Sequence, residues 1–411
     1  MSKSIFMIGW EFPPHNSGGL GVACQGLTRG LQSIGQPVVF ALPQVINGGG
    51  STKKVIYQFP DDQQSTDQSA NDQQTSNRQT MEMVLVNSVL QPYWRQPNIS
   101  ESMVVDMVEE SKNYGKVVAE VAEEYKKTTS LLHAHDWMSI PAGLRAREKV
   151  GKPLVLQIHS TEFDRAGGGR PNQAIADVEW QGMTEADKVI AVSHYTKQLI
   201  IDKYNIPADK IEVVHNGIDP NPDFHNQPLM KFLGEKPLIL FVGRLTIQKG
   251  PEYFLSVARR VLEKDRSAVF VLAGQGDMYQ SLLVSSAYQG LSGSVLFAGF
   301  LRGKEKQQLY QRADVFVMPS VSEPFGIAAL EAALSETPVI ISKNAGVNEV
   351  LPHAHPIDFW DTDKMASTIL ELISQPEKRR AQAQQVKAEA QNQGWRQAAA
   401  KIQRIYEELL G

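Results

Sequence analysis

Two carboxylates, Glu323 and Glu331, lie eight residues apart in a segment that follows an apolar run, Val315–Met318. Pro324 suits the first turn of a helix, where its missing N–H costs nothing. The free N–H groups at the start of such a helix favour an oxygen or a phosphate. They belong to Phe325, Gly326 and Ile327. One carboxylate can then accept hydrogen bonds from sugar hydroxyls while the other holds a ribose diol. The simpler alternatives are a charge placed for the helix dipole and an exposed helical residue.

A second candidate site is the loop from Gly243 to Gly250, which follows the apolar run Leu238–Val242. In open α/β sheets, ligands bind at the C-terminal ends of the strands. Arg244 and Lys249 bring two cations to that edge. A diphosphate needs such cations when it binds and again when it departs with additional charge. A surface charge pair is the alternative, and the position at a strand end favours the phosphate site.

The loop before residue 21 joins the first apolar run to a helical pattern and contains the paired glycines Gly18 and Gly19. Glycines let the backbone approach a ligand closely, and a helix N-terminus favours an anion. The loop nearly fits a dinucleotide-binding fingerprint, but Cys24 replaces its third glycine, and the next strand ends in Leu42-Pro43 without an acidic residue. These departures argue against a nicotinamide enzyme. A phosphate loop and a tight structural turn both remain open.

Polar side chains end two neighbouring strand patterns, at His133 to Asp136 and at His159. Strand alternation places His133 and His135 on one face, which would suit a metal ion. No third ligand is evident, and buried histidines at strand ends are common, so we expect no metal site. We interpret His159 and Asp136 as groups that face a cleft and bind sugar hydroxyls.

Short apolar runs alternate with helical patterns almost from end to end, and these elements must position the candidate residues. Runs without internal alternation are typical of strands buried on both faces of a parallel sheet. The strand–helix alternation predicts doubly wound sheets, and twelve strands are too many for one domain of 411 residues. The predicted strands are Ile5–Ile8, Val38–Leu42, Met83–Val86, Leu131–His133, Leu154–Ile158, Val189–Val192, Ile211–Val214, Leu238–Val242, Val269–Leu272, Val295–Phe297, Val315–Met318 and Val339–Ile341.

The domain boundary is placed in the Pro-, Asn- and Gly-rich segment that begins at His215, because a fresh strand pattern starts after it. The predicted units are residues 1–218, residues 219–390 and a terminal helix of residues 391–411. The apolar stripe of that helix must pack either on its own domain or back on the first. Residues 47–80 are mostly polar with almost nothing to bury, so we expect a mobile surface insertion there.

The bulk composition excludes several classes of protein. A net charge of −4 and a pI of about 6.2 give no basic excess for a nucleic-acid partner. A single cysteine excludes an internal disulfide and fits a reducing compartment. The N-terminus lacks the features of a signal peptide, and the apolar runs are far shorter than the ~20 residues that span a bilayer. We therefore expect a cytoplasmic enzyme, with peripheral attachment to a membrane left open.

Together these segments resemble glycosyltransferase family 4, whose members adopt the GT-B fold. The resemblance covers nearly the whole chain except residues 47–80, and the Glu323-x7-Glu331 segment is its most specific part. It implies two Rossmann-like, doubly wound parallel-sheet domains that face a central cleft, with a C-terminal helix that crosses back to the first domain. Supporting motifs are Gly18-Gly19, His133-Ala134-His135-Asp136-Trp137, His215-Asn216-Gly217-Ile218, Gly243-Arg244, Lys249-Gly250 and Ala273-Gly274-Gln275-Gly276.

The resemblance also implies a role for each candidate residue. In the family, the residue that matches His159 lies beside the transferred sugar, and the one that matches Asp136 helps to shape the reaction site. Glu323 would bind the sugar hydroxyls and Glu331 the ribose. The remaining predicted contacts to the nucleoside diphosphate are Gly18, Gly19, Arg244, Lys249, Gly274, Phe325, Gly326 and Ile327.

The resemblance implies a retaining reaction without a metal or another cofactor. The acceptor hydroxyl attacks from the face that the leaving phosphate departs, and a phosphate oxygen serves as the base. The donor would be a nucleoside diphosphate sugar, and the acceptor a glycan, a glycolipid or a small molecule. Glycogen synthases of the family usually carry a Lys two residues before the paired glycines. Asn16 stands there in this chain, which argues against ADP-glucose and a growing α-glucan.

Three further interpretations complete the analysis. Asp361-Thr362-Asp363 matches an acidic motif by which another class of glycosyltransferases holds a divalent ion, but a helix cap at Asp361 explains it. A nucleotide-sugar epimerase on the same scaffold is one alternative function. A non-catalytic sugar-nucleotide sensor is the other.

Overall fold

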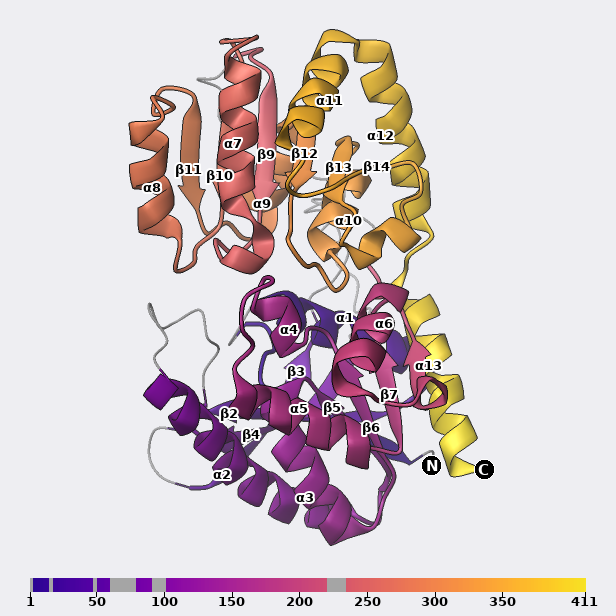
Figure 1. The fold of residues 1–411 in the computed structure, drawn as a ribbon. Coiled ribbons are helices and arrows are strands. Elements are labelled where there is room, and N and C mark those ends of the chain that lie inside the picture. Colours follow the sequence, from indigo (N-terminus) through magenta and orange to yellow (C-terminus); the bar gives the residue numbers. More distant parts are fainter. Residues whose placement is uncertain (1–2, 15–17, 47–49, 60–78, 91–100, 220–233) are drawn as a thin grey trace, which may run out of the picture.

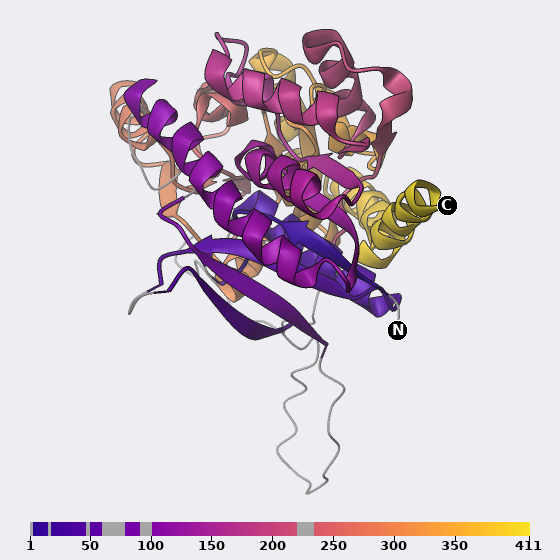
Figure 2. The same ribbon diagram turned by 90° about the horizontal axis from the view of Figure 1, so that it is seen from below.

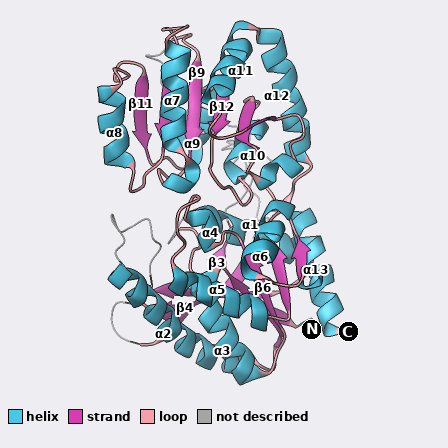
Figure 3. Ribbon diagram, viewed as in Figure 1, coloured by secondary structure: helices cyan, strands magenta, loops and turns pink. Residues whose placement is uncertain are grey.

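The computed structural model describes residues 3–14, 18–46, 50–59, 79–90, 101–219 and 234–411. It contains two α/β domains, one above the other in Figure 1, and helices cover both faces of each twisted sheet (Figure 1, Figure 3). Among the described residues, the two sheets contain eight and six strands. The structure therefore confirms the predicted GT-B architecture.

The first sheet consists of β1 (Ser4–Ile8), β2 (Val38–Gln44), β3 (Thr52–Gln58), β4 (Thr80–Asn87), β5 (Thr129–His135), β6 (Leu154–Ile158), β7 (Lys188–Ala191) and β8 (Ile211–Val213). Its strand order is β3-β4-β2-β1-β5-β6-β7-β8, and all neighbours are parallel except β3 and β4. Phe6 and Ile8 of β1 belong to one core layer, while Ile5 and Met7 belong to the layer on the opposite face. The unbroken apolar run therefore reflects burial on both faces, as predicted.

The second sheet consists of β9 (Leu238–Val242), β10 (Val269–Ala273), β11 (Val295–Gly299), β12 (Val315–Met318), β13 (Val339–Ser342) and β14 (His355–Ile357). Its order is β11-β10-β9-β12-β13-β14, and every pair is parallel. The direction in which the strands are added reverses between β9 and β12, as it does between β1 and β5 in the first sheet. Such reversals create crevices at the carboxyl ends of the strands.

The helices are α1 (Gly19–Ser33), α2 (Glu101–Tyr125), α3 (Ile140–Val150), α4 (Glu162–Arg165), α5 (Gln173–Glu185), α6 (His194–Tyr204), α7 (Pro251–Leu262), α8 (Tyr279–Tyr288), α9 (Gly303–Arg312), α10 (Ile327–Leu334), α11 (Thr362–Ser374), α12 (Pro376–Gln391) and α13 (Trp395–Leu410). Short 3-10 helices are η2 (Trp137–Ser139), η3 (Ala208–Lys210), η5 (Ile247–Lys249) and η6 (Gly346–Glu349). Asp361 caps α11 by accepting a hydrogen bond from Lys364 N at 3.1 Å, which confirms the predicted helix cap. In the described part of the chain, no helix has the length and apolar character needed to cross a bilayer.

Part of the predicted surface insertion is a strand. Residues 52–58 form β3, which pairs along its length with β4. Val55 and Tyr57 are half-buried beside the core, and the Tyr57 hydroxyl accepts a hydrogen bond from Gln25 Nε2 at 2.5 Å. The prediction failed here because the polar composition of the whole segment concealed a short strand whose alternate residues reach the core. Residues 47–49 and 60–78 lie outside the described residues, so the prediction of mobility stays untested there.

The C-terminal helix crosses back to the first domain, where α13 lies beside α1 (Figure 2). The Trp395 ring fills the space next to Gly26, where an added Cβ would lie 2.1 Å from the ring. Tyr406 reaches the sheet, and its hydroxyl lies 2.6 Å from His133 Nδ1. The two crossings between the domains run side by side, because Ile218 N donates to Gln393 O at 2.6 Å. The alternative in which the helix packs on its own domain is therefore excluded.

Candidate active site

The sheet topology gathers the predicted residues at the two crevices. In the first domain, the Gly18 loop follows β1 and Asp136 follows β5. In the second domain, the Gly243 loop follows β9 and Glu323 lies in the segment after β12. Each pair of loops flanks the point where its sheet reverses direction. Open α/β sheets bind ligands at such points, so the fold marks these loops as the candidate active site.

Lys249 and Glu323 form an ion pair in the second domain. Lys249 Nζ lies 2.8 and 2.7 Å from the two carboxylate oxygens of Glu323, and Ser320 Oγ donates to one of them at 3.1 Å. The Glu323 side chain is only 8% exposed, so Lys249 balances a charge that is almost removed from water. An anion that binds Lys249 would free the carboxylate to accept hydrogen bonds from neutral hydroxyls.

Arg244 lies in the same loop and is half-buried, and its guanidinium contacts no acceptor among the described residues. The loop is held in place by the end of the neighbouring strand. Gly274 has a φ of 156°, and a Cβ there would lie 1.8 Å from the Gly243 carbonyl oxygen. Only glycine fits this approach. In this structure Gly274 acts through packing that shapes the cationic loop.

Helix α10 begins at Ile327, so the prediction that Pro324 occupies its first turn is wrong. The Pro324 carbonyl instead accepts hydrogen bonds from Ser193 Oγ at 2.5 Å and Thr196 Oγ1 at 3.2 Å, both in the first domain. Gly326 follows with a φ of 111°, a left-handed conformation that interrupts any helix from Pro324. Within the described residues, no acceptor contacts the predicted N–H donors. These donors are Phe325, Gly326 and Ile327, and they leave the helix start available for an anion.

Glu331 faces a cavity of about 240 Å³ between the two domains. Its carboxylate accepts hydrogen bonds from Lys306 Nζ at 2.6 Å and from the Tyr310 hydroxyl at 3.0 Å. Val22 of the first domain lines the other side of the cavity. Glu331 is therefore neither a fully exposed helical residue nor a buried one, since its side chain is 23% exposed at a cavity wall.

Asp136 holds the segment that carries His159. The residue is 4% exposed, and its carboxylate accepts hydrogen bonds from His159 N at 2.6 Å and Ser160 N at 3.3 Å. Its φ of 57° is rare for a residue with a side chain and is typical of strained functional loops. Burial raises the pKa of Asp136 to about 7, against the lowering effect of Arg165 and these hydrogen bonds. In this structure Asp136 is a positioning residue for His159.

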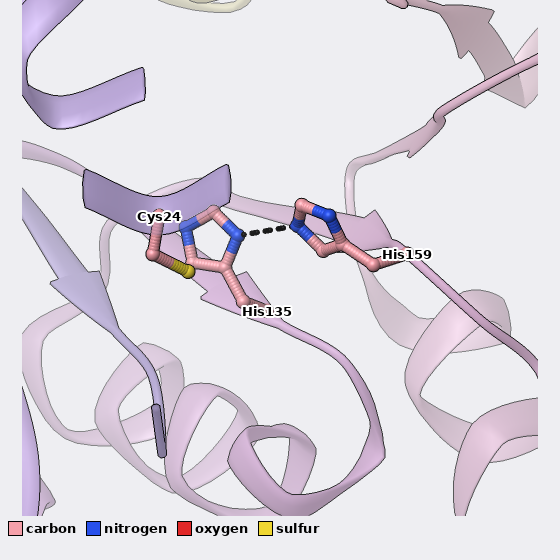
Figure 4. Close-up of side chains that lie close together, drawn as sticks. All are labelled: Cys24, His135 and His159. Atoms are coloured by element: carbon pink, nitrogen blue, oxygen red, sulfur yellow. Dashed lines mark hydrogen bonds between the residues drawn. The ribbon is translucent and has the colours of Figure 1, made fainter. Parts of the chain in front are cut away.

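Three neutral imidazoles line the ends of β5 and β6. The rings of His133 and His135 stack at 4.3 Å, which confirms that they share one face of the strand. His135 Nδ1 lies 3.2 Å from His159 Nε2 (Figure 4). Burial lowers the pKa of His133 and of His159 to about 3, and it also lowers the pKa of His135. All three rings are therefore uncharged near neutral pH.

The structure supplies a third potential metal ligand that sequence reasoning missed. Cys24 of α1 lies beside His135 and His159, and one ligand atom of each residue is within 4.8 Å of the others (Figure 4). The group differs from the pair considered in the sequence analysis, because it contains His159 and Cys24 and not His133. The parallel pairing of β1 with β5 brings α1 over residues that lie more than a hundred positions later in the chain. Sequence spacing alone contains no signal for this contact.

The paired glycines of the first loop have different surroundings. A Cβ at Gly18 would lie 2.6 Å from a carboxylate oxygen of Glu11, whereas a Cβ at Gly19 would meet open space. Glu11 is buried, and its carboxylate accepts a hydrogen bond from Gly21 N at 3.1 Å. One N–H of the α1 start is thus already occupied, and Gly19 keeps an open approach for a ligand. Residue 16 lies outside the described residues.

One contact between the domains joins the two halves of the candidate site, and sequence analysis did not single it out. Ser322 Oγ donates a hydrogen bond to Asp164 Oδ1 and lies 2.9 Å from the Tyr195 hydroxyl. Ser322 precedes Glu323, and Asp164 lies in the segment that follows His159. The contact therefore places the two candidate segments against each other across the interface.

A larger hollow of about 420 Å³ lies elsewhere in the first domain. Arg147 and Asp187 line it and form an ion pair at 3.0 Å, and Asp187 also accepts a hydrogen bond from Leu154 N at 2.7 Å. Leu154 begins β6, so the hollow lies at the edge of the sheet opposite to the crevices. Arg147 and Asp187 neutralise each other, and Asp187 also holds the start of β6. We therefore assign this hollow a structural role.

Family models and protein relatives match the sequence. The model "Glycosyl transferases group 1" matches residues 228–389, and "Glycosyltransferase Family 4" matches residues 114–222. An uncharacterised glycosyltransferase from Methanocaldococcus jannaschii is 33% identical over 361 residues, which cover 85% of this chain and 83% of that protein. The two family models match parts of both domains, and the matched residues include Lys249, Glu323 and Glu331.

Solved structures share the fold. The sucrose-phosphate synthase from Thermosynechococcus elongatus superposes with a TM-score of 0.76 at 17% identity over 99% of each chain. HepE from Anabaena, in complex with UDP and glucose, superposes with a TM-score of 0.71 at 16% identity, covering 99% of this chain and 100% of that one. At these identities the similarity concerns the arrangement of the two domains.

Proposed function

The chain belongs to glycosyltransferase family 4, and we propose that it transfers a hexose from a nucleoside diphosphate sugar to an acceptor hydroxyl with retention and without a metal. The observation that carries this proposal is the Lys249–Glu323 ion pair at the crevice of the second domain. It combines a cation for a phosphate with a carboxylate for sugar hydroxyls. The Ser322–Asp164 contact supports it, because it brings His159 of the first domain towards the same region.

The diphosphate would bind the cations of the Gly243 loop and the start of α10. Arg244 has no acceptor among the described residues, and the N–H groups at the helix start are similarly available. Charge develops on the departing phosphate as the glycosidic bond breaks, and preorganised donors stabilise such charge strongly. Lys249 would exchange Glu323 for phosphate oxygen, so the carboxylate turns to the sugar as the donor binds.

The nucleoside half would occupy the cavity beside Glu331. A volume of about 240 Å³ suits a ribose and a base, and Glu331 offers a partly exposed carboxylate to the ribose diol. Tyr310 and Lys306 hold that carboxylate in place. HepE binds UDP and glucose, which favours a uridine nucleotide and glucose as the first donor to test here.

Retention would follow from attack on the face from which the diphosphate leaves. The acceptor oxygen bonds to the anomeric carbon while the bond from that carbon to the phosphate oxygen breaks, and the phosphate oxygen accepts the proton of the acceptor hydroxyl. Asp136 is poorly placed to act as a covalent nucleophile, because its Oδ1 is held by two backbone N–H groups. The acceptor would be a glycan, a glycolipid or a small molecule bound by loops of the first domain.

The test begins with thermal melting of the full chain in UDP, GDP or ADP and in their hexose forms. A ligand that prefers the folded state raises the melting temperature. The stabilising sugar nucleotide is then incubated with acceptors in chelator, and NMR reports the anomeric configuration of the product. We expect transfer with retention in the presence of the chelator. Inversion, or a requirement for manganese, would overturn the mechanism.

Two outcomes would favour the alternative functions. A changed sugar nucleotide released without acceptor would indicate an epimerase. Binding without turnover across the acceptor set would indicate a sensor. Donor binding that is unchanged in the double variant Lys249→Ala/Glu331→Ala would overturn the assignment of the donor site to these residues.

A further inference from the structure

Cys24, His135 and His159 form a compact group of soft ligands at the floor of the first-domain crevice. One ligand atom of each residue lies within 4.8 Å of the others, and Figure 4 shows the His135 ring between Cys24 and His159. The three residues come from α1, from β5 and from the end of β6. The group is thus assembled by the fold and has no local sequence motif.

The spacing is close to that of a tetrahedral metal site. Zinc binds imidazole nitrogen at about 2.0–2.1 Å and thiolate sulfur at about 2.3 Å, so two such nitrogens lie roughly 3.3 Å apart and a nitrogen and sulfur roughly 3.6 Å apart. His135 Nδ1 and His159 Nε2 are 3.2 Å apart. The Cys24 sulfur lies within 4.8 Å of one nitrogen of each histidine, and rotation about χ1 of the cysteine changes this distance.

The chemistry of the group also suits a cation. His135 is fully buried, and its Nδ1 faces the Nε2 atom of His159. Neutral imidazole nitrogens are common ligands of divalent transition metals. Asp136 and Glu11 place carboxylate charge near Cys24. A cation there would offset those negative charges.

We propose that Cys24, His135 and His159 bind one thiophilic divalent cation, such as Zn²⁺, and that the bound ion blocks sugar transfer by occupying His159. The sulfur and two ring nitrogens donate electron pairs to the ion, and the thiol proton passes to solvent. The partly exposed side of His159 leaves the fourth position to water from the crevice. The ion is an inhibitor, and only this inhibition rests on the proposed function.

Binding is tested with Co²⁺ on the full chain, because a cobalt–thiolate bond absorbs in the near ultraviolet. We expect this band to saturate at one equivalent and Zn²⁺ to displace the cobalt. Cys24 is the only cysteine, so Cys24→Ala should abolish the band and weaken zinc binding at least tenfold. His353→Gln, at an exposed histidine, is the matched control. A missing band in the wild type, or unchanged zinc affinity in Cys24→Ala, would overturn the site.

Folding of the variants is checked by melting and circular dichroism. Should Cys24→Ala fail to fold, His135→Gln keeps the thiol and removes a nitrogen ligand, and it should weaken zinc binding at least tenfold. An affinity equal to that of the wild type would contradict the three-ligand site.

Inhibition is tested in the transfer reaction. Zinc should stop transfer by the wild type, a chelator should restore it, and Cys24→Ala should transfer at the basal rate with at least tenfold lower zinc sensitivity. Saturating donor should weaken zinc binding by the same factor as zinc weakens donor binding. Zinc that binds without inhibiting would refute the blocking of His159. Absence of all transfer would refute the proposed function, while the cobalt titration still decides the metal site.

Discussion

The two halves of the candidate site are built in opposite ways. In the second domain, charged side chains neutralise each other in the pairs Lys249–Glu323 and Lys306–Glu331. In the first domain, the imidazoles of His135 and His159 are uncharged, and each keeps one ring nitrogen without a partner in the described structure. The second domain holds charge in ion pairs that a ligand can exchange, whereas the histidines of the first domain are neutral groups.

This difference matches the two chemistries that a sugar transfer combines. A diphosphate carries charge and can replace a carboxylate on a lysine, so binding exchanges one ion pair for another. A sugar hydroxyl is neutral and needs donors and acceptors that carry no charge of their own. The contrast predicts that changes in the second domain cost far more activity than changes in the first.

The largest expected effect is that of Lys249→Ala. Removal of one preorganised donor to a developing charge costs about 10²–10³ in rate, so we expect a loss of that size in kcat/KM. The melting temperature should also fall, because Glu323 keeps a nearly buried charge without its partner. Steady-state kinetics and thermal melting measure the two effects.

Two further variants complete this experiment. Lys343→Ala removes an exposed lysine that pairs with Asp358, and it should change kcat/KM less than twofold. Lys249→Ala/Glu323→Gln should recover the melting temperature but not the activity. A loss of kcat/KM below tenfold in Lys249→Ala would contradict the larger role assigned to the charged residues of the second domain.

A smaller effect is expected for His159→Ala. A neutral hydrogen bond contributes about 0.5–1.5 kcal/mol, which corresponds to a loss of up to about tenfold in kcat/KM. The same kinetic assay measures it, and His194→Ala at the surface of α6 is the control. A loss as large as that of Lys249→Ala would show that the first domain contributes more than neutral contacts.

Ser322→Ala tests the contact that joins the two halves. The change removes a donor to the buried Asp164, and a hydrogen bond of this kind contributes about 1 kcal/mol. We expect a modest fall in urea-unfolding free energy and a few-fold rise in the donor KM. Ser281→Ala, at an exposed serine of α8, should change neither quantity. An unchanged donor KM in Ser322→Ala would show that the Ser322–Asp164 contact does not contribute to donor binding.

The last prediction is a pH trend in stability caused by Asp136. Because its pKa in the folded state is raised to about 7, its contribution to stability is present below the unfolded pKa of about 3.9 and is lost as the pH rises through 7. Asp136→Asn has no such titration and keeps an acceptor oxygen. The melting temperature of the wild type relative to the variant should therefore fall between pH 4 and pH 8. A constant difference would refute the raised pKa.

Most of the architecture could be predicted because buried parallel strands have a distinctive sequence. The unbroken apolar runs located β9 and β12, and with them the loops that carry Lys249 and Glu323. The edge strand β3 escaped because its residues alternate between solvent and core within a polar segment. The average composition of residues 47–80 does not show that alternation.

The parts of the site that could not be predicted depend on contacts between distant segments. Helix α10 starts later than expected because the Pro324 carbonyl is bonded to the first domain. Cys24 meets His135 only through the pairing of β1 with β5. The role of Ser322 depends on its contacts with Asp164 and Tyr195 of the first domain. Local propensity contains none of this information.

The return of α13 to the first domain has a consequence for how the protein is made. Trp395 and Tyr406 complete a core layer of the first domain, yet the ribosome adds them only after the whole second domain. During synthesis the face of α1 beside Gly26 stays uncovered while the second domain can already fold as a unit. The first domain is therefore translated first, but its core is completed only after the second domain has been synthesised. We expect the uncovered face of α1 to need protection in nascent chains until α13 emerges.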